Sequence, residues 1–354
     1  MQTILVTGGA GFVGSNLAIH FKNDILNCRV IALDNLKRRG SELSLNRLKK
    51  AGIEFVHGDV RVKEDLLAVG KVDIILDCSA EPSVLAGVSG SPDYVIQTNL
   101  VGTLNALELA RIHGSSFIFL STSRVYPIVQ INDLTFEETE TRFELSKNQK
   151  TQGASERGIS EDFSLQGARS IYGASKLASE LFIKEYVESY GIKAVINRCG
   201  VLTGPWQMGK VDQGVIVLWI ARHIYGGELS YIGYGGQGKQ VRDIMHVDDL
   251  CNLVSYQLKN MDLVNSQIFN VGGGRQVSIS LCELTELSQR ITGKKISIKS
   301  IKEDRPNDLR IYLTDCSKVS ALSNWRPNIS PGQIVEDISK WIIDNKVALE
   351  PILT

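Results

Sequence analysis

The sequence has no excess of charge of either sign, since 39 basic side chains are balanced by 39 acidic ones. It also has no segment in which lysine and arginine cluster, so it lacks the positive surface that phosphate backbones and anionic membranes attract. The sequence therefore does not have the charge pattern that is usual in proteins that bind nucleic acid or lipid. We therefore expect a small-molecule partner, with no nucleic acid and no membrane.

Cysteine is sparse, and the six cysteines contain no CxxC pair and no regular spacing. Most of them lie in apolar segments, where a free thiol packs as a small hydrophobic side chain. This pattern is typical of reduced core cysteines rather than of a disulfide framework or a metal site. We expect no bound metal.

Long apolar runs are missing as well. The run from 214 to 220 ends before Arg222, and strand-like residues begin already at Thr3, so neither a membrane span nor a secretory leader is indicated. We also find no internal repeat. The expected protein is soluble and cytoplasmic.

What the sequence does contain is an alternation of short apolar runs with stretches of helical periodicity. Nearly continuous apolar strands, rather than strands of alternating polarity, are typical of a parallel sheet that helices cover on both faces. We therefore predict an α/β fold with a Rossmann-type doubly wound parallel sheet. The predicted strands are Ile4–Val6, Val30–Leu33, Phe55–His57, Ile74–Leu76, Phe117–Leu120, Ala194–Asn197 and Ile268–Val271.

A glycine motif joins the first predicted strand to a helical stretch. The segment GGAGFVG at 8–14 places Gly8, Gly11 and Gly14 at the spacing of a dinucleotide-binding turn. Gly8 permits the tight turn, Gly11 lets the backbone approach a pyrophosphate, and Gly14 lets the helix pack closely against the strand. The N–H groups at the start of the helix, at Phe12 and Val13, are expected to face the anion.

The second predicted strand ends at Asp34, about twenty residues after the glycine motif. A carboxylate there can accept hydrogen bonds from the adenosine ribose and would repel a 2′-phosphate, so NAD is favoured over NADP. Arg38 and its basic neighbours follow closely, either as a solvated loop or as residues that tolerate a phosphate. Asp59 and Val60, after the third strand, are expected to meet the adenine.

The chain is expected to contain two parts. From about Cys199 onward, the regular alternation gives way to glycine-rich and aromatic segments. We predict that residues 1–198 and 245–275 form the NAD-binding Rossmann domain. Residues 199–244 and 276–354 are predicted to form a smaller, discontinuous C-terminal lobe that binds substrate. The polar stretch from 144 to 167 is predicted to be a surface insertion near the active site.

The segment YGASK at 172–176 places Tyr172 and Lys176 one turn apart, and hence on one face of a predicted helix. Thr122 lies just after the strand Phe117–Leu120. A tyrosine is a poor base at neutral pH unless nearby positive charge lowers its pKa, and Lys176 supplies such a charge. Together with the glycine motif, these three residues resemble the extended short-chain dehydrogenase/reductase family.

The resemblance covers essentially the whole chain and includes the segments at 99–105, 125–126 and 270–273. It implies an NAD-dependent enzyme with Thr122, Tyr172 and Lys176 as its catalytic residues. The chain departs from the family where His-x-Ala is replaced by Asp77-Cys78-Ser79-Ala80, and where Pro127 replaces a glycine. The further cofactor contacts that the resemblance implies are Asn35, Ser79, Ala80, Asn99, Tyr172, Lys176 and Cys199.

Four segments, at 121–126, 138–143, 212–214 and 238–243, are similar to those of the family's 2-epimerases of CDP-deoxyhexoses. The resemblance implies that Tyr172 takes the proton of the C2 hydroxyl while a hydride passes to NAD, and that Thr122 holds the same oxygen. Return of the hydride to the opposite face of the 2-keto sugar then inverts C2. The implied substrate contacts are Ser123, Arg124, Gln213, Gln240, Arg242 and Arg305, the two last at the diphosphate.

Several residues of the second part have two interpretations. Gln213 and Gln240 either touch the substrate or belong to polar surface loops. Trp206, Trp219 and Tyr234 have the shape to stack on a base, although core packing is favoured for each of them.

Other functions remain open. A C4-epimerase of a UDP-hexose would use the same catalytic residues with the sugar turned, and a non-catalytic NAD sensor would keep the fold alone. A 4,6-dehydratase is disfavoured, because it needs an acidic pair beside Thr122 where this chain has Ser123 and Arg124. The resemblance also implies a homodimer or homotetramer.

Overall fold

The computed structural model describes residues 1–25, 27–88, 90–210 and 213–354. Contacts between Cα atoms divide the chain into two compact units. Unit 1 consists of Met1–Val125, Ser170–Arg198 and Leu250–Phe269, and unit 2 of Tyr126–Arg169, Cys199–Asp249 and Asn270–Thr354. Both units are therefore assembled from segments that lie far apart in the sequence.

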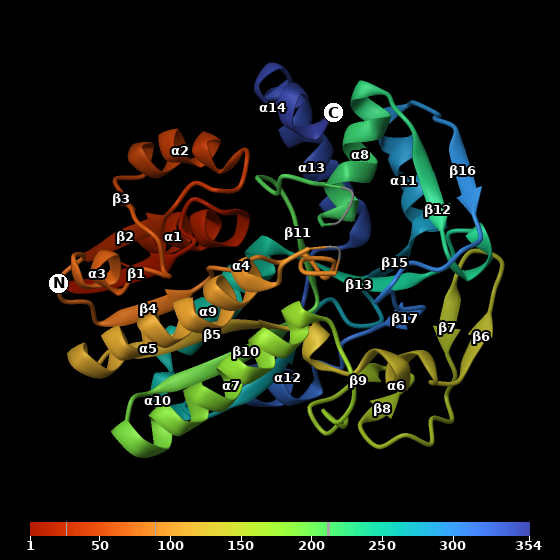
Figure 1. The fold of residues 1–354 in the computed structure, drawn as a ribbon. Helices are drawn as coiled ribbons and strands as arrows, with labels where there is room; N and C mark the ends of the chain where they lie inside the picture. The colour runs from red at the N-terminus through yellow and green to blue at the C-terminus, as the bar shows by residue number, and fades with distance from the viewer. Residues whose placement is uncertain (26, 89, 211–212) are drawn as a thin grey trace. The chain divides into compact units, whose positions relative to one another are not determined.

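A seven-stranded sheet, which lies mainly in unit 1, has the order β14-β10-β5-β4-β1-β2-β3 (Figure 1). The central strands run parallel in register, with Leu5 opposite Ile31 on one side and Ile75 on the other. Each predicted strand lies within one of these seven, so the doubly wound parallel sheet is confirmed. The strands are β1 (Gln2–Thr7), β2 (Cys28–Asp34), β3 (Glu54–His57), β4 (Ile74–Asp77), β5 (Ser116–Thr122), β10 (Ala194–Cys199) and β14 (Ile268–Val271).

Helices cover both faces of this sheet in unit 1. On one face, residues of α3 (Lys63–Leu67), α5 (Gly102–His113) and α7 (Ile171–Tyr190) join the strands in a continuous apolar core. On the other face, α1 (Phe12–Asp24) and α9 (Val247–Lys259) are joined by a 2.9 Å hydrogen bond between His20 and Ser255. Strands buried on both faces explain why their sequences are apolar at successive positions. Unit 1 also contains the shorter α-helices α2 (Ser44–Lys50), α4 (Asp93–Ile96) and α10 (Met261–Val264).

The long helix α7 has strong signals at both ends. The hydroxyl of Ser170 accepts the N–H of Gly173 at 3.1 Å, which caps the first turn. Gly191, with φ of +66°, ends the helix in the left-handed conformation that glycine adopts without strain. The helix therefore begins one residue before Tyr172, and its first two turns carry both Tyr172 and Lys176.

The described residues of unit 2 form a four-stranded sheet, three two-stranded pairs and several helices. The sheet joins β11 (Val201–Thr203), β13 (Val241–His246), β15 (Ser278–Ser280) and β17 (Ile311–Tyr312), and the pairs are β6–β7, β8–β9 and β12–β16. The apolar run predicted near 214–220 forms the buried helix α8 (Val215–Tyr225). The other elements are β6 (Phe136–Glu138), β7 (Phe143–Leu145), β8 (Ala154–Ser155), β9 (Gly158–Ile159), β12 (Leu229–Ile232), β16 (Ile298–Ile301), α6 (Ile128–Asn132), α11 (Leu281–Thr292), α12 (Ser317–Ser323), α13 (Pro331–Asp344) and α14 (Lys346–Leu353).

The polar stretch from 144 to 167 is more than a surface insertion. Its β8–β9 hairpin is joined to the segment after β17, because the N–H of Ile159 donates to the carbonyl of Leu313 at 2.8 Å. Ile159 and Phe163 are both buried. Leu145 is buried as well, so this mainly polar segment packs apolar side chains into the core of unit 2.

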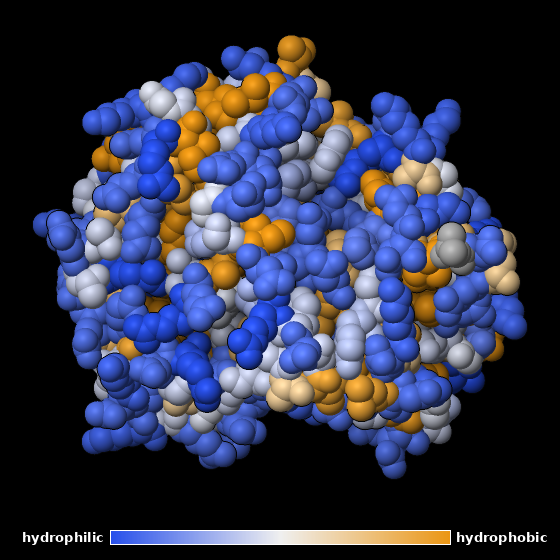
Figure 2. All heavy atoms as spheres, turned by 180° about the vertical axis from the view of Figure 1, so that it is seen from behind, coloured by the Kyte–Doolittle hydropathy of each residue, from blue (hydrophilic) through white to orange (hydrophobic). Residues whose placement is uncertain are grey.

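The surface carries some apolar side chains. On the face shown in Figure 2, these side chains form groups that are separated by hydrophilic ones. No helix among the described residues is both long and apolar enough to cross a membrane.

Candidate active site

The turn between β1 and α1 depends on glycines, because side chains there would collide with backbone. Gly8 has φ of +63°, a conformation that favours glycine. A Cβ on Gly14 would lie 2.2 Å from the carbonyl oxygen of Gly8. Sequence analysis missed the part played by Gly9, whose Cβ would lie 2.6 Å from the Cα of Ala32 on β2. The turn is therefore packed against the neighbouring strand as well as against its own helix.

The start of α1 fits the pyrophosphate of a dinucleotide. Gly11 is the N-cap residue and has no side chain that could bond the first turn. The first N–H groups of a helix, here those of Phe12, Val13 and Gly14, have no acceptor inside it, and the helix dipole favours an anion beside them. The backbone N–H groups at this helix start are therefore able to receive the phosphate that the sequence predicts there.

Asp34 lies at the end of β2, where its carboxylate is bonded to backbone. Its Oδ2 accepts the N–H of Ala10 at 3.1 Å, and its Oδ1 accepts the N–H of Leu36 at 2.8 Å. Burial raises the pKa of this carboxyl above its ordinary value. Asp34 therefore stabilises the glycine turn, and it lies at the end of β2, where the sequence predicts a contact with the ribose. Arg38 follows in the loop after this strand.

A pocket of about 330 Å³ opens where β2 and β3 end. Asn35 donates to Asp59 at 2.9 Å, and Arg61 pairs with Asp59 at 2.6 Å, which holds the pKa of that carboxyl well below its usual range. The side chain of Val60 is buried in the core instead. The lining residues are Asn35, Lys37, His57, Gly58, Asp59, Arg61 and Asp65.

The end of β4 is held by the buried carboxylate that replaces the family's histidine. Asp77 accepts hydrogen bonds from Thr7 at 2.7 Å and from Thr103 at 2.8 Å. The hydroxyl of Thr7 also accepts the N–H groups of Cys78 and Ser79. The start of the predicted cofactor segment at Ser79 and Ala80 is therefore held in place by Thr7, although Asp77 replaces the family's histidine.

Asn99 lies in a π-helical turn, η2 (Gln97–Val101), between α4 and α5. Its side chain bonds both the N–H and the carbonyl of Glu81, at 2.8 and 3.1 Å, and also reaches the hydroxyl of Ser175 at 3.3 Å. Its own carbonyl accepts the hydroxyl of Ser179. Asn99 thus joins the segment after β4 to the helix that carries Tyr172. Insertions of this kind are frequent at functional sites.

The three predicted catalytic residues all lie in unit 1. Thr122 is the last residue of β5, and its hydroxyl oxygen accepts the N–H of Arg124 at 3.2 Å. Tyr172 and Lys176 lie on successive turns of α7, and both are buried. The ammonium of Lys176 lies 4.3 Å from the centre of the Phe119 ring on β5, which places it against the strand that ends at Thr122.

The residues after Thr122 form a short helical turn, Ser123–Val125. Ser123 is buried, whereas Arg124 is partly exposed. Neither side chain is a carboxylic acid, so the two positions after Thr122 hold no acid and base pair.

In unit 2, the predicted diphosphate contact Arg242 is linked to the loop of the other one, Arg305, through Asp308. Arg242, on β13, pairs with Asp308 at 2.7 Å, and both side chains are largely buried. Asp308 belongs to the segment that begins at Arg305, and its N–H donates to the carbonyl of Arg305 at 3.3 Å. Arg242 is therefore tied to the loop that carries Arg305.

The other predicted residues of unit 2 have separate surroundings. Gln240 donates to the carbonyl of Ile232 at 3.0 Å, and Gln213 pairs with Lys210 through the backbone. Asp212, which belongs to one of the family-like segments, lies outside the described residues. Cys199 is the buried last residue of β10. Trp219 stacks on Tyr231 with 6.0 Å between ring centres, as expected for core packing.

Sequence analysis missed an aromatic cluster around Arg310. The guanidinium carbon lies 4.2 Å from the ring centre of Phe136, 5.2 Å from that of Tyr234 and 5.9 Å from that of Phe143. Burial raises the pKa of Tyr234 to about 12, so its hydroxyl stays protonated. These residues come from separate segments of the chain, which left no local signal.

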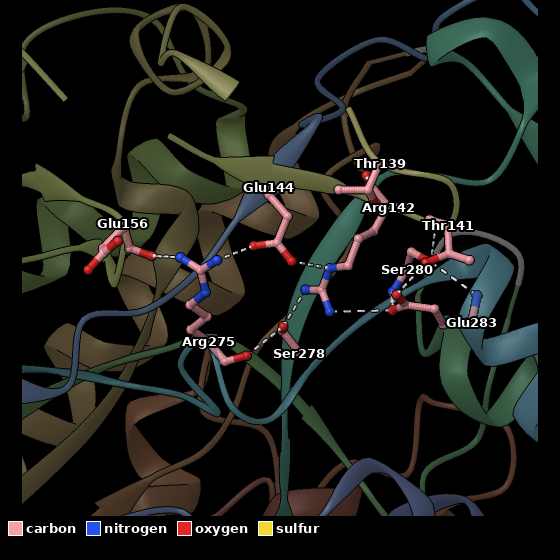
Figure 3. Close-up of polar contacts among 9 residues, drawn as sticks. All are labelled: Thr139, Thr141, Arg142, Glu144, Glu156, Arg275, Ser278, Ser280 and Glu283. Atoms are coloured by element: carbon pink, nitrogen blue, oxygen red, sulfur yellow. Dashed lines mark hydrogen bonds and ion pairs between the residues drawn. The ribbon is translucent and has the colours of Figure 1, made fainter. Parts of the chain in front are cut away.

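The family-like segment at 138–143 is held by ion pairs around Arg142 (Figure 3). Arg142 contacts Glu144 at 3.1 Å and Glu283 at 3.5 Å, and it donates to the hydroxyl of Ser278 at 2.5 Å. Glu283 also completes the capping box of α11 with Ser280. Arg142 therefore fastens the β6–β7 hairpin to β15 and to the start of α11.

The described residues contain no group of three or more histidine, cysteine or acidic side chains placed to hold a metal ion. No disulfide joins the six cysteines, and three of them, Cys28, Cys199 and Cys251, are buried in the core. The three that are partly exposed are Cys78, Cys282 and Cys316.

Known proteins share this architecture over its full length. The chain is 30% identical to the CDP-paratose 2-epimerase of Salmonella typhi, over 96% of this chain and 98% of that protein. It is 29% identical to the dTDP-glucose 4,6-dehydratase of Xanthomonas campestris pv. campestris, over 100% of this chain and 96% of that protein. The structure of UDP-glucose 4-epimerase from Thermotoga maritima matches with a TM-score of 0.78 and 26% identity, and covers 98% and 100% of the two chains.

A family model described as the NAD dependent epimerase/dehydratase family matches residues 4–272. The match begins in β1 and ends after β14, so it includes the glycine turn as well as Thr122, Tyr172 and Lys176. It confirms the predicted enzyme class and the predicted cofactor, NAD, which the family description names. The chain belongs to the NAD dependent epimerase/dehydratase family, a group of extended short-chain dehydrogenases/reductases.

Proposed function

We propose that the protein is a sugar-nucleotide epimerase that inverts C2 of a CDP-deoxyhexose. The epimerase chemistry is supported by the placement of Thr122 at the end of β5 and of Tyr172 and Lys176 on the first two turns of α7, within one compact unit. NAD, held at the β1–α1 turn and Asp34, supplies the acceptor and donor of the hydride.

The chain's own residues would handle the proton. Tyr172, as phenolate, accepts the proton of the sugar hydroxyl, and the nearby charge of Lys176 stabilises that phenolate. Thr122 donates or accepts a hydrogen bond at the same oxygen and so fixes its position. Tyr172 returns the proton when the carbonyl is reduced from its other face.

The surroundings of Thr122 support epimerisation over dehydration. A 4,6-dehydratase must remove a proton and expel a hydroxyl, which needs an acid and a base beside the threonine. Ser123 and Arg124 occupy those positions, and neither provides a carboxylic acid. We therefore propose Ser123 and Arg124 as substrate contacts.

Unit 2 offers the proposed contacts for the nucleotide. A guanidinium can bind two phosphate oxygens at once, so Arg242 and Arg305 suit the diphosphate. The 2.7 Å pair with Asp308 orients Arg242 in advance. Gln213 and Gln240 are proposed to touch the sugar or the base. We also propose that the protein is cytoplasmic and forms a homodimer or homotetramer. Light scattering would test the oligomeric state.

The choice of C2 and of CDP rests on full-length similarity to the Salmonella typhi 2-epimerase. A C4-epimerase of a UDP-hexose is the second candidate, and the match to the Thermotoga maritima structure, with its UDP-glucose, favours it. Both reactions would use the same three catalytic residues, so the sugar and its orientation decide between them. A non-catalytic NAD sensor would have no use for these three residues together.

Proton NMR of the sugar separates these functions. The purified protein is incubated in deuterated buffer, without added reductant, with CDP-paratose, CDP-glucose or UDP-glucose. Inversion at C2 of a CDP-sugar without deuterium at that carbon supports direct hydride transfer and the proposed function. Inversion at C4 of UDP-glucose supports the second candidate, and no turnover despite bound NAD supports the sensor.

A further inference from the structure

Unit 1 buries few charged side chains. Among its described residues, those with fully buried charged side chains are Asp77, Lys176, Glu180 and Arg198. Asp77 is bonded to two threonine hydroxyls at the end of β4, and Lys176 belongs to the proposed catalytic group. Glu180 and Arg198 have no part in the proposed chemistry, so their burial needs another explanation.

Glu180 and Arg198 form a compact ion pair. Their closest atoms are 2.7 Å apart, and the Nε of Arg198 lies 3.1 Å from both carboxylate oxygens of Glu180. The two side chains are 1% and 3% exposed. The hydroxyl of Ser121 donates to the same carboxylate at 2.5 Å. Glu180 is therefore bonded by partners on two strands.

These partners lie beside the catalytic residues. Glu180 follows Lys176 by four positions and Tyr172 by eight, so all three lie along one side of α7. Ser121 directly precedes Thr122 on β5, and Arg198 is on β10, the neighbour of β5 in the sheet. The cluster thus joins the helix that carries the proposed base to the strand that carries the proposed threonine.

A buried ion pair is a costly way to join two elements, because the loss of hydration often equals the attraction between the charges. Apolar side chains of similar volume would hold α7 against the sheet equally well. They would not fix its height and rotation, whereas hydrogen bonds to a planar guanidinium and a hydroxyl have defined directions.

We infer that Glu180, Arg198 and Ser121 are positioning residues, which set the register of α7 against β5 and keep the carboxylate charge of Glu180 from opposing the phenolate of Tyr172. The inference rests on the proposed function of Tyr172 as the base. Arg198 neutralises Glu180 at short range, so the pair adds little net charge to the site. Among the buried side chains of α7, the net charge that acts on Tyr172 is then that of Lys176.

Loss of one charge of the pair should therefore change the titration midpoint of Tyr172, although the two side chains are not in contact. Eight helical residues span roughly 12 Å. One unit charge at that distance, with an effective dielectric constant of about 20, moves a titration midpoint by roughly one pH unit. In Glu180→Gln, the fixed positive charge of Arg198 remains, since arginine does not deprotonate.

The test uses the full chain with NAD bound and three variants: Glu180→Gln, Glu180→Gln/Arg198→Met and Glu54→Gln. Tyrosinate absorbance is titrated in each, and the curve of the same variant carrying Tyr172→Phe is subtracted. We expect the Tyr172 midpoint to move to lower pH by about one pH unit in Glu180→Gln, and to return to its wild-type value in the double variant. Glu54, which pairs with Arg29 at the surface, is the matched control and should leave the midpoint unchanged.

Turnover tests the register. The double variant should lose about ten- to a hundredfold in kcat, with KM within about twofold, because small displacements of a reacting group are costly. A wild-type kcat in the double variant would overturn the inference, as would an unchanged midpoint in Glu180→Gln. If Glu180→Gln did not fold, the kcat of the double variant alone would decide. The absorbance titration needs no substrate, so it holds even if no sugar nucleotide is turned over, and the two failures stay distinguishable.

Discussion

The hydroxyl of Thr7, at the end of β1, donates a 2.7 Å hydrogen bond to the carboxylate of Asp77, at the end of β4. The same oxygen accepts the N–H groups of Cys78 and Ser79 at 3.2 and 3.3 Å. One side chain thus joins the strand before the glycine turn to the segment in which we propose cofactor contacts at Ser79 and Ala80.

Replacement of Thr7 by valine should weaken NAD binding by about tenfold and lower the free energy of unfolding by about 1–3 kcal/mol, because Asp77 then loses one of its two hydroxyl donors. Calorimetric titration with NAD and chemical denaturation measure the two effects. Thr7→Ser keeps the hydroxyl and is the matched control. An unchanged NAD affinity in Thr7→Val would show that the segment keeps its place without this bond.

Replacement of Gly14 by alanine should lower NAD affinity by about 10- to 100-fold, because the added Cβ lies 2.2 Å from the carbonyl oxygen of Gly8 and must displace the turn. The NAD content of the purified protein reports the loss. Gly90→Ala is the control, since a Cβ there meets no atom within 4 Å. If Gly14→Ala bound NAD like the wild type, the turn would be more adaptable than its packing indicates.

Replacement of Arg142 by methionine should lower the free energy of unfolding by about 1–3 kcal/mol, because Glu144, Glu283 and Ser278 all lose their shared partner (Figure 3). The β6–β7 turn should also become more sensitive to limited proteolysis. Arg157→Met is the matched control, since Arg157 is 68% exposed and pairs with Asp315 at 3.4 Å. Equal proteolysis of the two variants would contradict the role of Arg142 as an anchor.

Asp243 should make the stability of the protein depend on pH. Complete burial raises the pKa of Asp243 to about 6, from the ordinary value of 3.8. The folded chain therefore keeps this proton to higher pH than the unfolded chain, and the contribution of Asp243 to stability is lost as pH rises through 6. Relative to wild type, Asp243→Asn should gain about 3 kcal/mol in unfolding free energy between about pH 4 and pH 8. Denaturation curves at several pH values measure the difference, and a difference that does not change with pH would contradict the assignment.

The strands and the cofactor turn were predictable because their signals are local. Nearly continuous apolar runs identify strands buried on both faces, and the spacing of Gly8, Gly11 and Gly14 identifies the turn. Likewise, the four-residue spacing of Tyr172 and Lys176 is sufficient to place them on one side of a helix.

Other parts of the candidate site depend on tertiary approach and left no such signal. Arg198 on β10 meets Glu180 on α7, and Arg310 meets two aromatic rings of the β6–β7 hairpin and the ring of Tyr234. The burial of Val60 follows from its packing beside Gly102, where a Cβ would lie 2.7 Å from its methyl group. None of these contacts has a fixed spacing along the chain, so neither periodicity nor motif could reveal them.

The π-helical turn at Gln97–Val101 lies between α4 and α5 in one continuous helical segment, and it allows core packing and the contacts of Asn99 to be met by different faces. Each residue of an α-helix turns the side chains by about 100°, and the wider turn changes the phase between α4 and α5. The apolar residues of α5 can therefore pack into the core, while Asn99 faces Glu81 and the serines of α7. Deletion of a single residue from this turn would restore a regular helix and rotate Asn99 away from Glu81 and from the serines of α7. The number of residues in this segment is therefore as important for the position of Asn99 as their identity.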